Sequence, residues 1–364
     1  MSSELRILHT LRDHGPVGGL QILVRRTVEA QRRAGHDARV TALSGDPDLA
    51  PHEAPGFAPD VVHVHDSWTA PGLEGFRRVR TLHAFGHGCS AMDRYLGDGE
   101  PCERAHGPAC VLQWARCGHT VRFDQLAQQY RAVSRELPTV RTADAVIVLS
   151  EFVRRTAIAN GVAAERVHVV PPPAPTHPVD PSFDTAQPGL VTFLGRAVPA
   201  KGLDVLIEAI AHVPQARLRI VGDGHALGEA RAHAARVAPD RVEVAGWVEG
   251  DARWAELSRA SVIAMPNRWP EPFGLVGLEA AWAGRPIVAT ATGGVTEWLV
   301  DGVTGIGVPG GDVDALAGAL ARLVDSPEEC ARMGRAGRAR VERWPGDDDY
   351  ARALVDAYAA AVTP

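Results

Sequence analysis

The sequence predicts an α/β protein made of two Rossmann-like domains. Its 364 residues exceed what one typical hydrophobic core buries, which favours two domains. Short apolar runs alternate with helical stretches, as they do in open parallel sheets with crossover helices. This alternation occurs twice, and a proline-rich segment from Pro171 to about Pro188 separates the two copies. We therefore expect two parallel sheets joined by a linker.

The first copy of the pattern, residues 1–175, begins with a strand over Leu5–Thr10. A helix is expected over 20–34, because apolar residues recur there at three- and four-residue spacing and Gly35 fits its C-terminal end. The same criteria predict five more strands and two more helices. These strands are 38–43, 61–65, 79–84, 145–149 and 167–170, and the helices are 122–142 and 151–160.

The second copy, residues 189–345, follows a linker over 176–188. Its strands are expected at 190–194, 217–221, 241–245, 261–265, 286–289 and 304–308, with helices in the gaps and at 312–325 and 327–343. The break Trp344-Pro345-Gly346 precedes a last helix over about 348–362. We expect the C-terminal segment 346–364 to pack back on the first domain.

Composition and charge exclude several classes of protein. Hydrophobic residues make up 45% and charged residues 23% of the chain, as in ordinary globular domains, and the net charge of −6 argues against a nucleic-acid partner. No apolar run is long enough for an integral membrane segment. The N-terminus lacks an apolar signal core, which favours a cytoplasmic protein. Peripheral membrane contact through the arginine-bearing helix 20–34 is an alternative to packing of this helix against the core.

The most informative segment is 265–284, where a strand pattern ends in a proline-rich loop and a helix begins near Gly274. The exposed amides of a helix start form an anion site. Glu271 lies in the loop before this start, and Glu279 lies inside the helix. A carboxylate on each side of an anion site suits a ligand that carries both phosphate and hydroxyl groups, such as a nucleotide sugar.

A second segment, Leu194–Gly202, places two cations at a turn between a predicted strand and a predicted helix. Open α/β sheets bind ligands at such turns. Arg196 and Lys201 suit a diphosphate, because they stabilise the negative charge that develops on a departing nucleotide.

These two segments resemble the signatures of the GT4-type retaining glycosyltransferases, the glycosyl transferases group 1. The run Glu-Pro-Phe-Gly-Leu-Val-Gly-Leu-Glu-Ala, from Glu271 to Ala280, resembles the Glu-x7-Glu motif of the family. Arg196 and Lys201 match its Arg-x4-Lys pattern, and the resemblance extends over most of residues 1–345. It implies the GT-B fold, in which two Rossmann-like domains face each other across a cleft.

The resemblance implies a role for each matching residue on the donor side. Arg196 and Lys201 would bind the donor diphosphate, Glu271 the hydroxyls of the transferred sugar, and Glu279 those of the ribose. His83, at the end of a predicted strand, would contact the donor sugar and completes the expected catalytic set with Arg196, Lys201 and Glu271. Further donor contacts are expected from Gly18, Gly19, Gly222, Val248, Phe273, Gly274 and Leu275. For Gly18 and Gly19, contacts in the acceptor loop are the alternative.

Candidate acceptor contacts lie at the end of another predicted strand, in Val-Val-His-Val-His-Asp. They are His65 and Asp66. His63 lies two residues before His65 and shares its face of the strand, so a buried role for His63 is equally expected.

Segment 87–119 departs from the pattern of the family. It is glycine-rich, has little periodicity and contains four of the five cysteines, Cys89, Cys102, Cys110 and Cys117. We expect a long loop that shapes the acceptor pocket and needs a staple. A structural zinc site of four thiolates would supply one, although the spacing contains no Cys-x2-Cys knuckle. Disulfides, free thiols or another metal are alternatives.

Together these observations predict a retaining glycosyltransferase that moves a hexose from a UDP- or GDP-linked sugar to a hydroxyl of a small molecule, glycan or lipid. No cofactor is expected for catalysis, since Arg196, Lys201 and the helix amides supply positive charge. Two alternatives are a sugar-nucleotide epimerase of the same architecture and a non-catalytic sugar-nucleotide-binding partner subunit. A nicotinamide dehydrogenase is disfavoured, because residues 12–20 lack a Gly-x-Gly-x-x-Gly turn.

Overall fold

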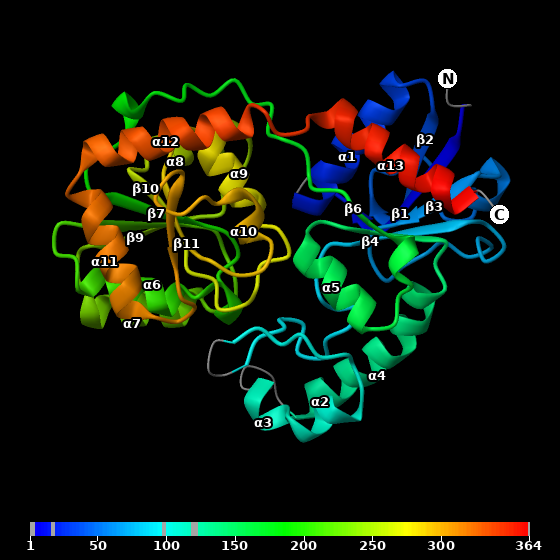
Figure 1. Ribbon diagram of the computed structural model, residues 1–364, viewed down its shortest axis with the longest axis horizontal. Helices are drawn as coiled ribbons and strands as arrows, with labels where there is room; N and C mark the ends of the chain where they lie inside the picture. The colour runs from blue at the N-terminus through cyan, green and yellow to red at the C-terminus, as the bar shows by residue number, and fades with distance from the viewer. Residues whose placement is uncertain (1–3, 16–18, 97–99, 118–122, 363–364) are drawn as a thin grey trace. The chain divides into compact units, whose positions relative to one another are not determined.

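The structure is a computed structural model that describes residues 4–15, 19–96, 100–117 and 123–362. The chain divides into two compact units (Figure 1). The first comprises Met1–Arg94, Glu103–Pro173 and Pro345–Pro364, and the second comprises Tyr95–Cys102 and Ala174–Trp344. Each unit is built on one six-stranded sheet in which every pair of neighbouring strands is parallel.

The first sheet has the strand order β2-β1-β3-β4-β5-β6, so the chain winds outward in both directions from the β1–β3 pair. Its strands are β1 (Arg6–His14), β2 (Asp37–Gly45), β3 (Val61–Val64), β4 (Arg78–Leu82), β5 (Ala145–Val148) and β6 (Val167–Val169). All six strands that the sequence predicts for this half are confirmed. In the register of β1 and β3, His9 lies opposite His63.

The first and last helices of the chain, α1 (Gly19–Arg33) and α13 (Asp347–Val362), lie side by side on this sheet (Figure 1). Val24 of α1 and Leu354 and Tyr358 of α13 are fully buried in one apolar cluster with the strands. Ion pairs of 2.8 Å join Arg26 to Asp347 and Arg33 to Asp348. The unit also contains α4 (Phe123–Arg141) and α5 (Glu151–Ala159).

The expectation of a long loop over 87–119 is wrong for part of this segment, which contains two short helices, α2 (Pro108–Leu112) and α3 (Trp114–Cys117). Proline fits the first position of a helix, so Gly107-Pro108 is a helix-start signal. Helices of five and four residues are too short to produce a periodic pattern in the sequence.

The second sheet has the strand order β12-β11-β10-β7-β8-β9, which is the order of a dinucleotide-binding Rossmann fold. Its strands are β7 (Leu190–Leu194), β8 (Arg217–Val221), β9 (Val242–Gly246), β10 (Val262–Met265), β11 (Ile287–Thr290) and β12 (Gly305–Val308). The six strands predicted for this half are thus confirmed. Its helices are α6 (Leu203–Ala211), α7 (Leu227–Val237), α8 (Gly250–Arg259), α9 (Leu275–Trp282), α10 (Val295–Trp298), α11 (Val313–Val324) and α12 (Pro327–Val341). Among the helices described, none combines the length and the apolar character needed to cross a bilayer.

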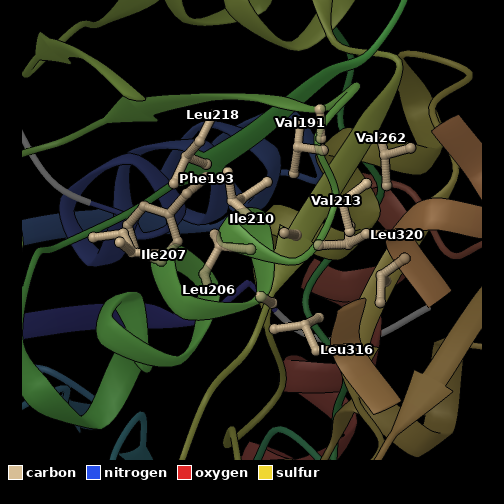
Figure 2. Close-up of a cluster of buried hydrophobic side chains, with 14 of the residues drawn as sticks. Val191, Phe193, Leu206, Ile207, Ile210, Val213, Leu218, Val262, Leu316 and Leu320 are labelled. Carbon is tan, nitrogen blue, oxygen red and sulfur yellow. The ribbon is translucent and has the colours of Figure 1, made fainter. Parts of the chain in front are cut away.

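A continuous apolar core lies between the second sheet and helices α6 and α11 (Figure 2). Strands β7 and β8 contribute Phe193 and Leu218, and helix α6 contributes Leu206 and Ile210, whose side chains lie within the cluster. Close packing of this kind holds the strands rigidly, so the loops at their carboxyl ends start from fixed positions.

We expect Leu206→Ala to lower the free energy of unfolding of the second unit by about 2–5 kcal/mol, because it removes fully buried methyl groups and leaves a cavity. Urea denaturation followed by tryptophan fluorescence measures this loss. Val303→Ala is the control, since Val303 is 46% exposed and its truncation should change the free energy of unfolding by no more than about 0.5 kcal/mol. Equal losses in the two variants would contradict the placement of Leu206 in the core.

Candidate functional site

Several predicted donor-side residues follow the carboxyl ends of strands in the second sheet. Strand β7 has β8 on one side and β10 on the other, so the chain winds outward in both directions from this point. Ligands of open α/β sheets bind outside the carboxyl ends of the strands at such a switch point. Arg196 and Lys201 follow β7, and Glu271 follows β10. The two most informative segments of the sequence therefore meet at this position.

Lys201 and Glu271 form an ion pair at the switch point. The ammonium Nζ of Lys201 lies 2.7 Å from Oε2 of Glu271, and the two side chains are only 17% and 12% exposed. The same Oε2 accepts hydrogen bonds of 2.8 Å from Nδ2 of Asn267 and Nε1 of Trp269. The ammonium also lies 5.2 Å from the centre of the Trp269 ring. Three donors on one oxygen fix the orientation of this carboxylate.

The loops that carry this ion pair are tied together through the backbone. Lys201 ends a short turn, η4 (Pro199–Lys201), and the amide of Arg268 donates to the carbonyl of Ala200 at 2.9 Å. The side chain of Arg268 also pairs with Asp204 at the start of α6. The distance between the lysine and the glutamate is therefore set by the backbone of both loops.

Lys201 is the single lysine of the sequence, which contains 37 arginines. Arginine thus supplies the positive charge of the side chains at every other position. Lysine presents a compact point charge, whereas arginine presents a planar fork. The exception indicates that position 201 favours a compact ammonium group.

Arg196 follows β7 directly after Gly195 and is exposed. Among the described residues it forms no ion pair, so its guanidinium is available to a bound anion. The backbone on its C-terminal side is fixed, since the amide of Ala197 donates to the carbonyl of Asp223 at 2.8 Å.

The start of α9 presents backbone amides next to Glu271. Gly274 occupies the N-cap position with a φ of 91°, a conformation that glycine adopts without strain. No side chain caps this helix, so the amides of its first turn, from Leu275 onward, have no side-chain acceptor. Phe273 is buried, and its carbonyl accepts a hydrogen bond of 2.7 Å from Nε1 of Trp298. A fixed helix start of this kind binds anions.

Glu279 lies one turn further along α9 and pairs with Arg253 of α8. The two side chains are 21% and 24% exposed, so both remain accessible to a ligand. The ion pair orients the carboxylate of Glu279.

Gly222 and Val248 follow β8 and β9. A Cβ at Gly222, which has a φ of 151°, would lie 1.8 Å from the carbonyl oxygen of Gly195, so only glycine lets the two loops approach this closely. Val248 is half-buried, and its neighbour Trp247 is 45% exposed. These positions border the switch point on the β8 side.

In the first unit, His83 ends a row of hydrogen-bonded imidazoles that crosses β4, β3 and β1. Its Nε2 lies 3.1 Å from Nδ1 of His65. Nε2 of His65 lies 2.8 Å from Nδ1 of His9, and Nε2 of His9 lies 2.8 Å from Oε1 of Gln31 on α1. His65, His9 and Gln31 are buried, whereas His83 is partly exposed.

A second row begins at the same glutamine. Nε2 of Gln31 donates to the hydroxyl of Tyr358 at 3.2 Å, and that hydroxyl lies 2.7 Å from Nδ1 of His63. Nε2 of His63 lies 2.6 Å from Oγ1 of Thr81. His63 is fully buried and has the buried role that the sequence left open.

His9, His63 and His65 are the described side chains whose metal-ligating atoms lie close together, within 4.8 Å of one another. Their rings are stacked, with interplanar angles of 14° for His9 and His65 and 30° for His63 and His65. Each of their ring nitrogens already has a hydrogen-bond partner. A metal ion would have to break several of these bonds, so the geometry favours a hydrogen-bond network.

Burial keeps these imidazoles neutral. It lowers the pKa of His9 to about 4 and that of His83 to about 4, and it lowers the pKa of His65 and of His63 well below 6.5. A hydrogen bond from His9 to Gln31 acts against this shift, but desolvation is the larger effect.

The candidate acceptor residues His65 and Asp66 both have internal partners. The carboxylate of Asp66 accepts hydrogen bonds from the amides of Arg12 at 2.6 Å and Trp68 at 2.7 Å, which shapes the loop after β3. Gly19 is the first residue of α1, and Gly18 lies outside the described residues.

None of the four cysteines of segment 87–119, namely Cys89, Cys102, Cys110 and Cys117, forms a disulfide in the part of the chain that the structure describes. The alternative of disulfides between them is therefore wrong. Sγ of Cys117 lies 3.5 Å from the carbonyl of Gln113, within its own helical turn. The structural zinc site stays a prediction.

Sequence reasoning missed the partners of the site residues. Asn267 and Trp269 lie inside the informative segment but match no motif, and Arg253 lies on another helix. His9 and Gln31 belong to an apolar strand and an amphipathic helix, where nothing in the local pattern sets them apart. The one available signal was a polar side chain on the expected core face of each element.

Two family models match the chain. The model described as Glycosyl transferases group 1 matches residues 182–340, and that described as Glycosyltransferase Family 4 matches residues 52–177.

Curated relatives include a GDP-mannose-dependent alpha-(1-6)-phosphatidylinositol monomannoside mannosyltransferase of Mycobacterium tuberculosis. It is 34% identical over 281 residues, which cover 70% of this chain and 71% of the relative. A D-inositol 3-phosphate glycosyltransferase of Xylanimonas cellulosilytica is 37% identical over 225 residues, which cover 55% of this chain and 53% of the relative. The chain thus spans about half the length of this second relative.

Solved structures with the same architecture include Anabaena Alr3699/HepE in complex with UDP and glucose. It has a TM-score of 0.73 at 19% identity and covers 97% of this chain and 99% of its own. WaaG, a glycosyltransferase involved in lipopolysaccharide biosynthesis, has a TM-score of 0.69 at 17% identity and covers 96% and 98%. The predicted GT-B fold of two Rossmann-like domains is therefore confirmed.

We expect the free energy of unfolding of the first unit to fall as the pH falls from 6.5 towards 4. His9 stays neutral in the folded state until about pH 4 but becomes protonated in the unfolded chain below about pH 6.5, so stability present above pH 6.5 is lost on acidification. Each such histidine contributes a slope of about 1.4 kcal/mol per pH unit in this window.

Urea denaturation at a series of pH values measures this slope. His9→Gln should reduce it, and His225→Gln, a change at an exposed position, should leave it unchanged. The same slope in His9→Gln and in the unmodified chain would contradict the assignment.

Proposed function

This chain belongs to the glycosyl transferases group 1, glycosyltransferase family 4, and on that premise we propose that it transfers a hexose from a nucleoside-diphosphate sugar to an acceptor hydroxyl, with retention of configuration at the anomeric carbon. The single observation that carries the proposal is the pairing of Lys201 with Glu271 beside the start of α9, at the switch point of the second sheet.

The cations of the site suit a pyrophosphate. In the proposal, Lys201 and Arg196 bind the two phosphates, and the amides of Gly274 and Leu275 donate to one of them. Fixed positive groups stabilise the charge that develops on the leaving nucleoside diphosphate. The chain supplies this charge itself, so we expect transfer to continue in the presence of a metal chelator.

Glu271 is suited to binding sugar hydroxyls and poorly suited to nucleophilic attack. Its Oε2 accepts three hydrogen bonds, from Lys201, Asn267 and Trp269, which lower its nucleophilicity. In the proposed reaction the acceptor oxygen attacks the anomeric carbon from the face of the leaving group as the bond from that carbon to the phosphate oxygen breaks. The hydroxyl proton passes to a phosphate oxygen. The products are the glycoside and the nucleoside diphosphate.

The names of the relatives support particular choices of the nucleotide base of the donor and of the class of acceptor. In the proposal, Glu279, which pairs with Arg253, accepts hydrogen bonds from the ribose, and main-chain atoms at Val248 meet the base. HepE binds UDP, and the mycobacterial relative is GDP-mannose-dependent, which supports uridine or guanosine as the base. The relatives act on an inositol phosphate and on a phosphatidylinositol mannoside, which supports a hydroxyl-rich small molecule, glycan or glycolipid as acceptor.

The single lysine offers a direct test of the donor class. Chain labelled with 13C,15N-lysine should give one lysine side-chain signal, because the sequence contains one lysine. UDP or GDP should shift this signal, and uridine or guanosine without phosphate should not. A signal that no nucleoside diphosphate moves at concentrations that raise the Tm would place the ligand elsewhere.

We expect Lys201→Ala to lower kcat by about 10²–10³-fold, because it removes a charge that stabilises the departing diphosphate. Lys201→Arg should restore little of this loss, since a planar fork does not fit the same oxygen of Glu271. Formation of glycoside and release of nucleoside diphosphate measure turnover, with Arg335→Ala, an exposed change on α12, as the control.

Retention of turnover in Lys201→Ala would overturn the proposed site. Conversion of the donor sugar to an isomer without acceptor would instead identify an epimerase. Binding of donor by the unmodified chain without any turnover would identify a binding subunit.

We expect Glu279→Ala to raise KM for the donor about ten- to a hundredfold with a smaller change in kcat, because hydrogen bonds to a charged group contribute about 1.5–3 kcal/mol and the ribose does not take part in the chemistry. Initial-rate kinetics at varied donor concentration separate the two constants. Glu328→Ala, an exposed change on α12, is the matched control. A loss confined to kcat would contradict a role in ribose binding.

A further inference from the structure

We propose that Gln31, through His9 and His65, sets the tautomer of His83, so that the Nδ1 lone pair of His83 is presented to a hydroxyl of a bound substrate. The four side chains form an unbroken series of contacts of 2.8, 2.8 and 3.1 Å from α1 across β1 and β3 to the end of β4. In this arrangement Gln31, His9 and His65 are positioning residues, and His83 is the residue that meets the substrate.

The direction of the series follows from the amide of Gln31. Its Nε2 donates to Tyr358, so its Oε1 faces His9 as an acceptor. An amide oxygen cannot donate, so Nε2 of His9 must carry the proton. A neutral imidazole has one donor and one acceptor, so Nδ1 of His9 accepts.

The same rule then fixes the next two rings. Because Nδ1 of His9 accepts, Nε2 of His65 must carry a proton, and Nδ1 of His65 therefore accepts from Nε2 of His83. His83 is left with an unprotonated Nδ1. Among the described residues this nitrogen has no hydrogen-bond partner, and His83 is partly exposed.

The second row agrees with this direction. Tyr358 accepts from Gln31 and donates its own proton to Nδ1 of His63, so Nε2 of His63 donates to Thr81. Every ring nitrogen and hydroxyl of both rows, except Nδ1 of His83, then has a partner of the opposite kind. The reverse order requires the amide of Gln31 to turn over, with its nitrogen towards His9.

Because the imidazoles of His9 and His65 are buried, they stay neutral, and only their tautomers can change from one to the next. His9 and His65 are both buried, and their rings stack on each other with centroids 5.2 Å apart. A protonated ring would lack compensating charge there, so each imidazole stays neutral and a change at Gln31 reaches His83 as a change of proton position.

The chemical consequence is that His83 offers an acceptor and no donor at its exposed nitrogen. Hydroxyl groups of sugars and polyols can donate to such a nitrogen, and phosphate oxygens cannot. The assignment of the hydroxyl to a substrate of glycosyl transfer rests on the proposed function, whereas the tautomer of His83 does not.

The tautomer is measured by nuclear magnetic resonance on chain labelled with 15N-histidine, because protonated and unprotonated ring nitrogens have well-separated 15N shifts. The signals of His83 are identified by their loss in His83→Asn. We expect the unmodified chain to show a protonated Nε2 and an unprotonated Nδ1 at His83. A protonated Nδ1 would overturn the proposal without any activity measurement, and so would a metal ion held by the three histidines.

Two substitutions at Gln31 test whether the tautomer of His83 depends on the hydrogen-bond direction that Gln31 sets or only on the packing of its side chain. When its carboxyl group is ionised, Gln31→Glu can only accept, so it should keep the His83 tautomer but reverse that of His63, because the Tyr358 hydroxyl then donates to the new carboxylate. Gln31→Leu removes the acceptor, so the reversed order becomes populated. Thr27→Val is the matched control, since Thr27 is buried on the same helix and bonds only to the carbonyl of Leu23.

Turnover should follow the tautomer. If the two orders become equally populated in Gln31→Leu, kcat/KM should fall about twofold, in proportion to the fraction of His83 that keeps an unprotonated Nδ1. Gln31→Glu and Thr27→Val should stay close to the unmodified chain. An unchanged His83 tautomer in Gln31→Leu would overturn the proposal, whereas the expected tautomers in a chain that transfers no sugar would overturn only the proposed function.

Discussion

Lys201 and Glu271 hold each other in a setting that neither would tolerate alone. Both side chains are largely buried, and removal of one partner from such a pair leaves an uncompensated charge away from water. Asn267 and Trp269 complete the shell of the carboxylate, and the backbone bond from Arg268 to Ala200 fixes the loops that carry the pair. Helix α9 begins close to this arrangement, since a Cβ at Gly274 would lie only 3.2 Å from Cγ of Glu271.

The first unit satisfies its buried polar groups in a different way. At the β1–β3 switch point of its sheet, the side chains are neutral imidazoles, a glutamine, a tyrosine and a threonine. Each gains a partner from the others, and no charge has to be desolvated. The switch point of the second sheet thus carries a charged pair, whereas that of the first sheet carries a neutral hydrogen-bond network.

The strands were predictable because each is a short buried run of apolar residues. Such a run can be identified from its own sequence, without knowledge of the strands beside it. Glu271 and Glu279 could be selected as candidate site residues because they belong to one local motif. Arg253, which orients Glu279, lies 26 residues away on α8, and Gln31 and Tyr358 are separated by 327 residues. Only the fold brings residues so far apart in the sequence into contact, so no local sequence pattern predicts that they are partners. The short helices α2 and α3 were not predicted for a local reason, since five and four residues are too few to show a helical hydrophobic period.

The presence of a lysine at position 201, in a chain that otherwise uses arginine, follows from the geometry of Glu271. Its Oε2 already accepts from an amide and an indole, so one approach direction remains for the cation. An ammonium needs only that direction, and it can also lie 5.2 Å from the ring of Trp269. A guanidinium seeks two parallel bonds to both oxygens of a carboxylate and would displace one of the existing donors. The carboxylate would then lose the orientation that its three donors give it, so the choice of cation and the orientation of the carboxylate are one constraint.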